Sequence, residues 1–299
     1  MFFSVFSLCL GANILTYSLF ALSLKISHSL GAIDLPNERK IHAKPMARAG
    51  GSAFFVSFVL FLLLLPISGS YKFALFLSSC AIFMLGIIDD CISIPPILKL
   101  LGQILSAGIY IFLNRESSLP IISAITLLWI VFLTNAINLC DGLDGLACTI
   151  SSEQALCLSV LALIFQNADV LLCSILLFGA TVGFLPHNFP NAKIFMGDCG
   201  ALFLGFMLGC LSSKLAFESQ SIICAISILF IFRIPILDTA QSFIRRIIAN
   251  KNPFSADRGH FHHRLLYFGF TKECTTLVLL TVSLLFGFIG VMIAFLTMQ

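Results

Sequence analysis

The chain has 299 residues, of which 59% are hydrophobic and only 10% are charged, and its mean hydropathy is +1.05. A chain of this length and composition does not stay soluble in water, so the sequence predicts an integral membrane protein and excludes a soluble globular one. The net charge of +3 is small and gives no general signal for nucleic-acid binding. The 11 cysteines are scattered through apolar runs without a C-x-x-C pair, which favours buried free thiols.

The apolar runs predict an all-α, polytopic membrane fold with about ten transmembrane helices in one domain, residues 1–299. A helix that spans the hydrocarbon needs roughly 20 apolar residues, with a lower limit of about 17. The first run lacks the basic start of a signal peptide and leads directly into Lys25, so we expect a retained helix. The predicted spans are 2–24, 52–65, 72–88, 97–113, 119–134, 146–165, 170–185, 201–215, 222–242 and 275–295.

The distribution of basic residues predicts the orientation, because Lys and Arg are retained on the cytoplasmic side. Alternate loops differ strongly, so we expect the richer set to be cytoplasmic and both termini to be extracytoplasmic. The same cytoplasmic loops carry the acidic clusters described below, which predicts an active site on that face. The richer set comprises Lys25, Arg39, Lys40, Lys44, Arg48, Lys99, Lys193, Arg245, Arg246, Lys251, Arg258, Arg264 and Lys272; the poorer set comprises Lys72, Arg115 and Lys214.

Two adjacent carboxylates, Asp89 and Asp90, follow the third predicted span. Adjacent carboxylates repel each other and are costly near hydrocarbon, so they usually persist beside a cation or a basic partner. The alternative is a solvated helix end without a ligand, and the pair alone does not decide between the two.

A more specific pattern follows the fifth span, where Asn138, Asp141 and Asp144 recur at intervals of three around Gly142 and Gly145. This spacing places the polar groups on one side of a helical turn. The glycines let backbone N–H groups approach a phosphate or a nucleotide closely. A calcium loop competes with this interpretation, but the run lacks the further oxygen ligands and the closing Glu of an EF-hand. A purely structural turn is the remaining alternative.

A single carboxylate, Asp198, lies between Gly197 and Gly200 in a segment where Pro and Gly interrupt the helical pattern. The flanking glycines leave Asp198 room to bind a metal that bridges phosphate oxygens. Phe195, three residues earlier, is a candidate to stack on a nucleobase, although ordinary packing explains an isolated Phe equally well. Asn188 lies in the same segment and is a candidate for substrate binding.

The last cytoplasmic loop combines Arg258 with His260, His262 and His263. Guanidinium and imidazole donors together suit a sugar phosphate. Zinc is the rival for three histidines in four residues, but Zn²⁺ prefers Cys or His ligands at wider spacing, and the sequence has no C-x-x-C partner.

One further carboxylate, Asp238, falls inside the ninth predicted span, three residues after Pro235. An acidic side chain within a membrane is costly unless it is paired. Arg233, five residues away, is the partner that the sequence suggests.

Together these motifs resemble the polyprenyl-phosphate N-acetylhexosamine-1-phosphate transferases, the glycosyltransferase 4 family. Within it, the opening loop and residues 252–263 look like the undecaprenyl-phosphate N-acetylglucosaminyl-1-phosphate transferase branch rather than the related phospho-N-acetylmuramoyl-pentapeptide transferases. Members of this family often have the motif D-D-x-x-D, and in this chain Ser93 occupies the fifth position of the motif. The resemblance covers nearly the whole chain and rests on the segment from Asp34 to His42, Arg48 with Gly50 and Gly51, Asp89-Asp90, Asn138 with Asp141 and Asp144, Gly197-Asp198 with Gly200, and His260 with His262 and His263.

The resemblance implies transfer of a HexNAc-1-phosphate, in the first instance GlcNAc-1-phosphate, from a UDP-sugar to undecaprenyl phosphate, with release of UMP. This would be the first membrane step of cell-wall polymer or O-antigen-type glycan synthesis, in the bacterial inner (cytoplasmic) membrane. It implies Mg²⁺, with Mn²⁺ as an alternative, on Asp198 and Asp90, and it is compatible with a homodimer. The implied catalytic residues are Asp89, Asp90, Asp141 and Asp198, and the implied substrate-binding residues are Lys44, Asn138, Asp144, Asn188, Phe195, Arg258, His260, His262 and His263.

Some alternatives stay open at this point. Family analogy makes Asp89 or Asp90 a base, yet a phosphate monoester has a second pKa of about 6 and is already a dianion in the cytoplasm. Positioning or metal binding is as plausible a role. A phospho-N-acetylmuramoyl-pentapeptide transferase is the alternative within the family. A cation- or proton-coupled transporter is the alternative outside it, for which only Asp238 and Glu153 lie deep enough in the membrane.

Overall fold

The computed structural model describes residues 2–35, 45–114, 119–250 and 259–298. The sequence candidates Lys44 and Arg258 lie outside the described residues. The elements are α1 (Phe2–Ser18), α2 (Phe20–Leu30), β1 (Ile33–Asp34), β2 (Met46–Ala47), α3 (Gly51–Leu64), α4 (Gly69–Ile92), α5 (Pro96–Asn114), α6 (Pro120–Cys140), α7 (Leu146–Ile164), α8 (Ala168–Asn188), α9 (Gly197–Ser219), α10 (Ile222–Ile231), α11 (Arg233–Ile248), α12 (Phe261–Tyr267) and α13 (Lys272–Thr297).

The structure confirms an all-α, multi-pass membrane protein. Among the described residues, 7 helices, α4 to α9 and α13, are long and apolar enough to cross a bilayer. Two further apolar segments are broken helices, and α3 is apolar but shorter. The count of ten spans stays a prediction. Strands β1 and β2, which the sequence did not predict, pair antiparallel over two residues each.

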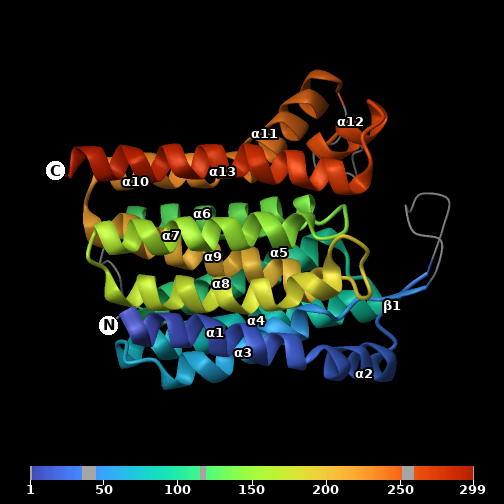
Figure 1. Ribbon diagram of the computed structural model, residues 1–299. Helices are drawn as coiled ribbons and strands as arrows, with labels where there is room; N and C mark the ends of the chain where they lie inside the picture. Colours follow the sequence, from blue (N-terminus) through green and yellow to red (C-terminus); the bar gives the residue numbers. More distant parts are fainter. Residues whose placement is uncertain (1, 36–44, 115–118, 251–258, 299) are drawn as a thin grey trace.

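Two predicted spans are bent rather than continuous. The α1–α2 pair bends by 46° and the α10–α11 pair by 73°, so the predicted span over 222–242 is divided between two helices. The second break has a local cause, because Pro235 lies in the first turn of α11 and its ring and missing N–H disfavour continuation of α10. As a result, α11 leaves the direction of its neighbours and projects from the bundle (Figure 1).

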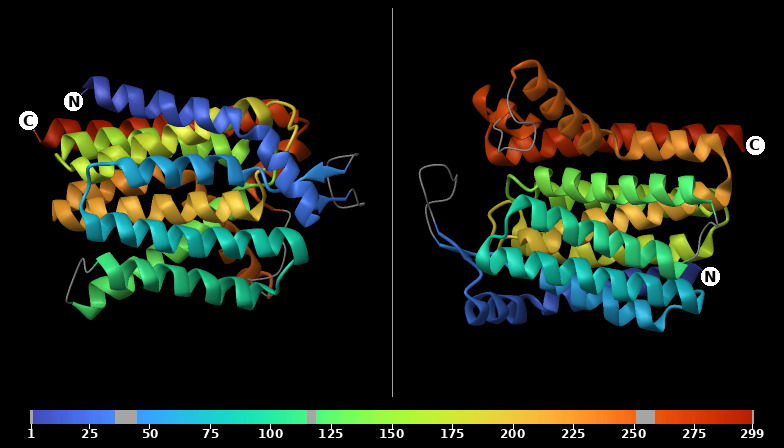
Figure 2. Two further views of the ribbon diagram at one scale, coloured as in Figure 1. Left: turned by 90° about the horizontal axis from the view of Figure 1, so that it is seen from below. Right: turned by 180° about the vertical axis from the view of Figure 1, so that it is seen from behind.

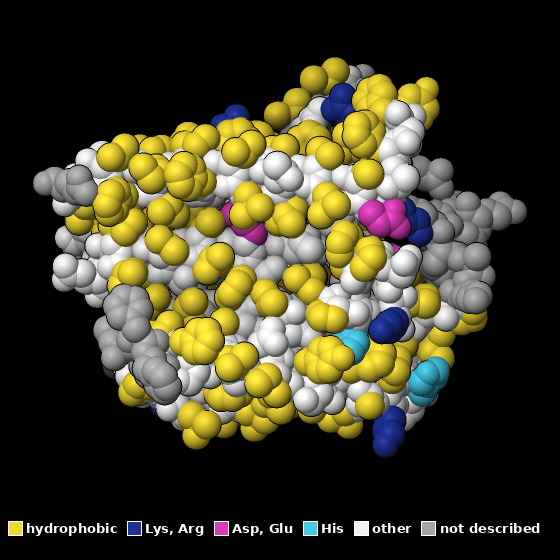
Figure 3. All heavy atoms as spheres, in the orientation of Figure 1, with side chains coloured by type: hydrophobic (Ala, Val, Ile, Leu, Met, Phe, Trp, Pro, Cys, Tyr) yellow, Lys and Arg dark blue, Asp and Glu magenta, His cyan; other side chains and the backbone are white. Residues whose placement is uncertain are grey.

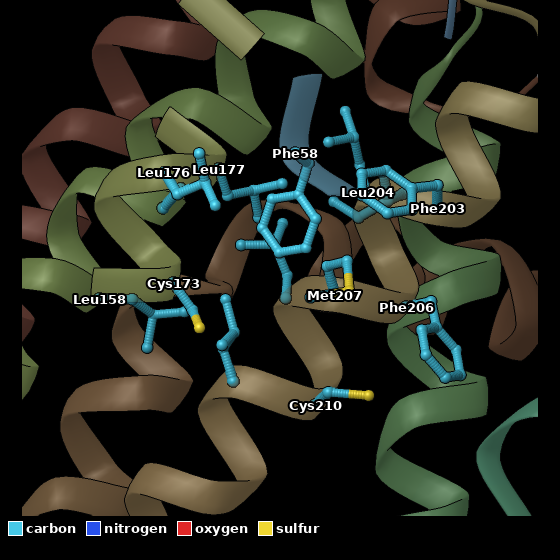
Figure 4. Close-up of a cluster of buried hydrophobic side chains, with 14 of the residues drawn as sticks. Phe58, Leu158, Cys173, Leu176, Leu177, Phe203, Leu204, Phe206, Met207 and Cys210 are labelled. Carbon is cyan, nitrogen blue, oxygen red and sulfur yellow. The ribbon is translucent and has the colours of Figure 1, made fainter. Parts of the chain in front are cut away.

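Helix α9 forms the centre of the bundle. Every residue from Cys199 to Leu215 is buried, which is the behaviour expected of a helix that is apolar on all sides. Figure 2 shows α9, in orange-yellow, enclosed by helices from the first and second halves of the chain. In Figure 4, Phe203 and Met207 of α9 lie in one cluster with Phe58 of α3 and Leu177 of α8.

Glycines set the distance between α9 and its neighbours at the start of the helix. A Cβ on Gly51 of α3 would overlap the backbone of Gly200, and one on Gly86 of α4 would overlap the backbone of Cys199. Small residues allow this close approach, which is how helices in membranes commonly gain packing. The first turn of α9 is therefore fixed against α3 and α4 by direct backbone contact.

The two ends of the bundle differ in character. Both termini lie at one end, while β1, α12 and the turns that carry the acidic clusters lie at the other (Figure 1). On the face seen in Figure 3, hydrophobic side chains cover most of the surface, and the ionisable side chains gather mainly toward the end with β1 and α12.

The glycine contact predicts a difference between two Gly→Ala variants. Gly86→Ala should destabilise the protein, by about 1–3 kcal/mol, because its new methyl group meets the backbone of Cys199. Gly108→Ala on α5 is the matched control, because nothing lies within 4 Å of a Cβ there. It should be neutral or stabilising by up to ~1 kcal/mol. Thermal unfolding in detergent measures both, and equal effects would contradict the close contact.

Candidate functional site

The site is organised around Asp198, in the first turn of α9. Lys99 Nζ lies 2.6 Å from its Oδ1, and Arg48 Nη2 lies 3.0 Å from its Oδ2. In the amide orientation that satisfies both neighbours, Asn138 donates to Oδ1 of Asp198 at 2.8 Å and accepts from Lys99 at 3.1 Å. One carboxylate thus gathers residues from α5, α6 and the segment before α3.

Asp90 caps the start of α9 from the neighbouring helix α4. Its side chain is fully buried, and its oxygens accept from the backbone N–H groups of Asp198 at 2.8 Å and Cys199 at 3.0 Å. These N–H groups lie in the first turn, where a helix offers no internal partner and favours a negative charge. Arg48 Nε also lies 3.4 Å from Asp90. Metal ligation by Asp90, as the sequence suggested, stays a prediction.

Gly197 is required for the same junction. Its φ of +75° lies in the left-handed region, which glycine adopts without strain. A Cβ at this position would overlap the carbonyl oxygen of Arg48 and lie 2.6 Å from Oδ2 of Asp90. Both the backbone conformation and the crowding therefore exclude a side chain.

Asp89 makes different contacts from Asp90, although the two are adjacent. Its Oδ2 lies 2.8 Å from Lys99 Nζ, and its Oδ1 accepts from the backbone N–H of Ile94 at 2.8 Å. Ser93, which replaces the usual third Asp of the motif, has a φ of +49° at the end of α4. It forms the turn that brings α5 and Lys99 back toward Asp89.

Arg48 links three carboxylates. Beside its contacts to Asp90 and Asp198, its Nη1 lies 3.6 Å from Oδ1 of Asp34 in β1. Burial alone would lower the pKa of Arg48, but the charges of Asp90, Asp198 and Asp34 raise it above its ordinary value. The guanidinium is thus held charged at the centre of the cluster.

Sequence reasoning missed Lys99 as a site residue and counted it only as a marker of orientation. A signal was present, because Lys99 lies in the first turn of α5, where the helix dipole disfavours a cation. A basic residue in the first turn of the helix that follows two adjacent carboxylates indicates an ion pair between the lysine and a carboxylate.

One helical turn away from this cluster, two amide side chains form hydrogen bonds between α5 and α6. Gln103 donates to Asn135 at 3.2 Å and Asn135 donates to Gln103 at 2.6 Å. Gln103 lies one turn after Lys99, and Asn135 lies one turn before Asn138. The reciprocal pair therefore fixes the separation of the two helices from which Lys99 and Asn138 reach Asp198.

The loop 141–145 joins α6 to α7 beside the cluster. Burial, with the neighbouring charge of Asp198, raises the pKa of Asp141 to about 7, while Arg48 opposes the shift. Asp144 Oδ2 accepts from the backbone N–H of Ala192 at 3.3 Å. The motif of Asn138, Asp141 and Asp144 thus lies near Asp198, and Asp144 contacts the segment before α9.

The histidine segment is anchored to α11. His260 Nδ1 lies 2.8 Å from Oδ2 of Asp238, and the backbone N–H of Phe261 donates to Oδ1 at 2.7 Å. Arg233 is therefore not the partner of Asp238. Its guanidinium instead lies 4.2 Å from the ring centroid of Phe286 on α13, which is a cation–π contact.

His262 lies against the loop 141–145. Its side chain is buried, and a Cβ on Gly142 would overlap its Nε2. Burial, followed by the neighbouring His263, lowers the pKa of His262 to about 3, so the ring is neutral near pH 7. The structure thus brings the histidine segment to the same loop as Asp141.

The two candidates before α9 differ in the range of their contacts. Asn188 is buried and donates to the carbonyl of Ile194 at 3.0 Å. The backbone of Phe195 accepts from Gly50 at 3.0 Å and donates to Ala47 at 2.8 Å, and its side chain is partly exposed. Asn188 thus shapes the loop, while the backbone of Phe195 joins it to the segment before α3.

Comparisons with known proteins fit these motifs. The model of glycosyl transferase family 4 matches residues 72–216. A probable undecaprenyl-phosphate N-acetylglucosaminyl 1-phosphate transferase of Bacillus subtilis is 37% identical over 88% of this chain and 77% of its own. A decaprenyl-phosphate N-acetylglucosaminephosphotransferase of Mycolicibacterium smegmatis is 32% identical over 90% and 77%. A phospho-N-acetylmuramoyl-pentapeptide-transferase of Staphylococcus saprophyticus is 36% identical over 68% and 63%.

The fold and the site define a polytopic membrane protein with a compact cluster of carboxylates and cations at one end of its helices. With relatives this similar over most of their length, the chain belongs to glycosyl transferase family 4.

The raised pKa of Asp141 predicts a pH-dependent effect of Asp141→Asn. A carboxyl group in an unfolded chain titrates near pH ~3.9, whereas Asp141 in the fold titrates at about 7. The folded state therefore takes up a proton as the pH falls from 8 to 6 and gains stability. Asn does not titrate, so the substitution should raise the unfolding temperature more at pH 8 than at pH 6.

Thermal unfolding of the detergent-purified protein at both pH values measures this difference. Asp169→Asn, in the first turn of α8, is the control for the loss of one carboxylate at another place. An equal effect of Asp141→Asn at the two pH values would contradict the assignment.

Proposed function

We propose that this protein transfers GlcNAc-1-phosphate from UDP-GlcNAc to undecaprenyl phosphate, giving undecaprenyl-diphospho-GlcNAc and UMP. The observation that carries the proposal is the cluster of Asp198, Lys99, Arg48 and Asn138, which suits a diphosphate. Relatives in family 4 are named as transferases of this kind.

In the reaction, an oxygen of the acceptor phosphate attacks the phosphorus that carries the sugar. The bond from this phosphorus to the bridging oxygen breaks, and UMP leaves with that oxygen. Several negative charges meet in such a step, so catalysis depends mainly on alignment and neutralisation. Lys99 and Arg48 supply two positive charges at one point, and both are positioned to exchange Asp198 for phosphate oxygens.

The residues fit a magnesium ion. Mg²⁺ is usually bound by one or two carboxylates together with substrate phosphates, and Asp198 offers one such carboxylate. Asp90 is the second ligand that the sequence implies, although both of its oxygens also accept from α9. When bound, the ion would neutralise charge on the donor diphosphate.

Asp89 acts in this scheme by holding Lys99 rather than as a base. Its carboxylate is paired with Lys99 and with the N–H of Ile94. A phosphate monoester with a second pKa of about 6 needs no base at neutral pH. On the donor side, Phe195 and Asp144 are the candidates to meet the uracil, beside loop 141–145.

We place the protein in the bacterial inner membrane, with the site on the cytoplasmic face and both termini outside. The basic residues of the loops support this orientation, and both termini lie at the end of the bundle opposite β1 and α12 (Figure 1). The transporter alternative loses its support. Asp238 is paired with His260, and Glu153 accepts from Ser283 at 2.6 Å.

The function is tested by incubating the purified protein with undecaprenyl phosphate, Mg²⁺ and a panel of UDP-sugars. Release of UMP should be fastest with UDP-GlcNAc. UMP release only with UDP-MurNAc-pentapeptide would favour the alternative within the family, and no UMP with any sugar would overturn the proposal.

Two variants separate the roles of the carboxylates on α9 and α4. Asp198→Asn should abolish UMP release while the unfolding temperature stays close to that of the wild type. Asp90→Asn should lower the unfolding temperature as well, because an amide accepts through one oxygen and the cap contributes ~1 kcal/mol. Unchanged turnover in Asp198→Asn would remove it from the metal role, and unchanged stability in Asp90→Asn would contradict its role as a cap.

A further inference from the structure

Helix α11 has no assigned part in the reaction, yet it makes three contacts to the segment that begins the histidine motif. Asp238 accepts from His260 and from the backbone of Phe261. Arg245, two turns further along the same face, donates to the carbonyl oxygen of Gly259 at 2.9 Å. The segment 259–261 is therefore attached to α11 along about 10 Å of helix.

The carboxylate of Asp238 is fully used by these contacts. Asp238 and His260 are both buried, with side chains 4% and 6% exposed. Each oxygen of Asp238 accepts one hydrogen bond, and an ionised carboxylate has no hydrogen to donate. His260 must therefore carry a hydrogen on Nδ1, and in the neutral ring this leaves Nε2 as a hydrogen-bond acceptor.

The orientation of the His260 ring affects the neighbouring ring of His262. The rings of His260 and His262 are parallel, with 5.8 Å between their centroids. The ring of His262 in turn lies against Gly142, in the loop between Asp141 and Asp144. A change at Asp238 therefore acts on the histidines before it acts on the cluster around Asp198.

We propose that Asp238 is a positioning residue, which fixes the ring and the hydrogen of His260 so that Nε2 accepts a hydrogen bond from a hydroxyl group of the sugar substrate. This role rests on the proposed function, and it explains why a carboxylate lies buried near the start of α11, where an unpaired one would be costly. A carboxylate that orients a functional histidine typically contributes roughly tenfold to hundredfold in activity.

Asp238→Asn tests the proposal with little change in shape. The N–H of Phe261 needs an acceptor, so the amide oxygen stays with Phe261 and the NH₂ group turns to His260. The hydrogen of His260 should then move from Nδ1 to Nε2, so that Nε2 would donate where the wild-type ring accepts. We expect kcat for UMP release to fall by roughly tenfold to hundredfold, with a smaller change in KM for UDP-GlcNAc.

The matched control is Thr239→Val, which removes the buried and unpaired hydroxyl of the next residue on α11. It should leave kcat at the wild-type level, and the unfolding temperature of both variants should stay close to that of the wild type.

Nitrogen NMR of protein labelled with ¹⁵N-histidine reads the position of the hydrogen without substrate. The chain has only 6 histidines, and His260→Gln identifies the signal. A wild-type His260 with its hydrogen on Nε2 alone would overturn the proposal. So would a fall in kcat with the hydrogen still on Nδ1, which marks a structural loss, or a moved hydrogen with unchanged kcat.

Failure of the proposed function and failure of the positioning role of Asp238 give different results. If the wild type releases no UMP, the proposed function fails and the link to turnover fails with it, whereas the NMR signal still decides whether Asp238 orients His260. If the wild type releases UMP and Asp238→Asn does so at the same rate, only the positioning role is overturned.

Discussion

The hydrogen bonds from the first turn of α9 to Asp90 are the interaction on which the site depends. A buried carboxylate is costly unless it is paired, and here it meets N–H groups that the helix itself leaves unpaired. The same contact decides where α9 begins, and so where Asp198 stands. Because Gly51 and Gly86 bring α3 and α4 into backbone contact with that turn, the junction has little freedom to adjust.

The charge of the cluster follows from this geometry. Asp90 and Asp198 lie close enough to repel each other, and Arg48 contacts both of them and Asp34. Lys99 adds the second cation between Asp89 and Asp198. The two adjacent carboxylates therefore have different roles: Asp90 caps α9, while Asp89 pairs with Lys99. Their environments differ more than their positions in the chain suggest.

Composition and periodicity predicted the membrane class and the approximate helices, because apolar length is a local property. They failed where the cause is not local. The predicted eighth span began at residue 201, whereas α9 begins at Gly197, because its cap comes from another helix. The partner of Asp238 was misjudged for the same reason, since His260 lies more than twenty residues away. The spacing of the motifs predicted most of the acidic cluster, but Lys99 belongs to none of these motifs.

The burial of α9 has a mechanical consequence. Bilayers differ in thickness, and a spanning helix whose apolar length does not match responds by tilting or by deforming the lipid around it. In this bundle, α5 and α13 expose much of their apolar surface and meet the lipid first, whereas α9 is enclosed almost throughout. Strain from the bilayer is thus taken up by peripheral helices. The central helix, which carries Asp198, keeps its place as the composition of the membrane changes.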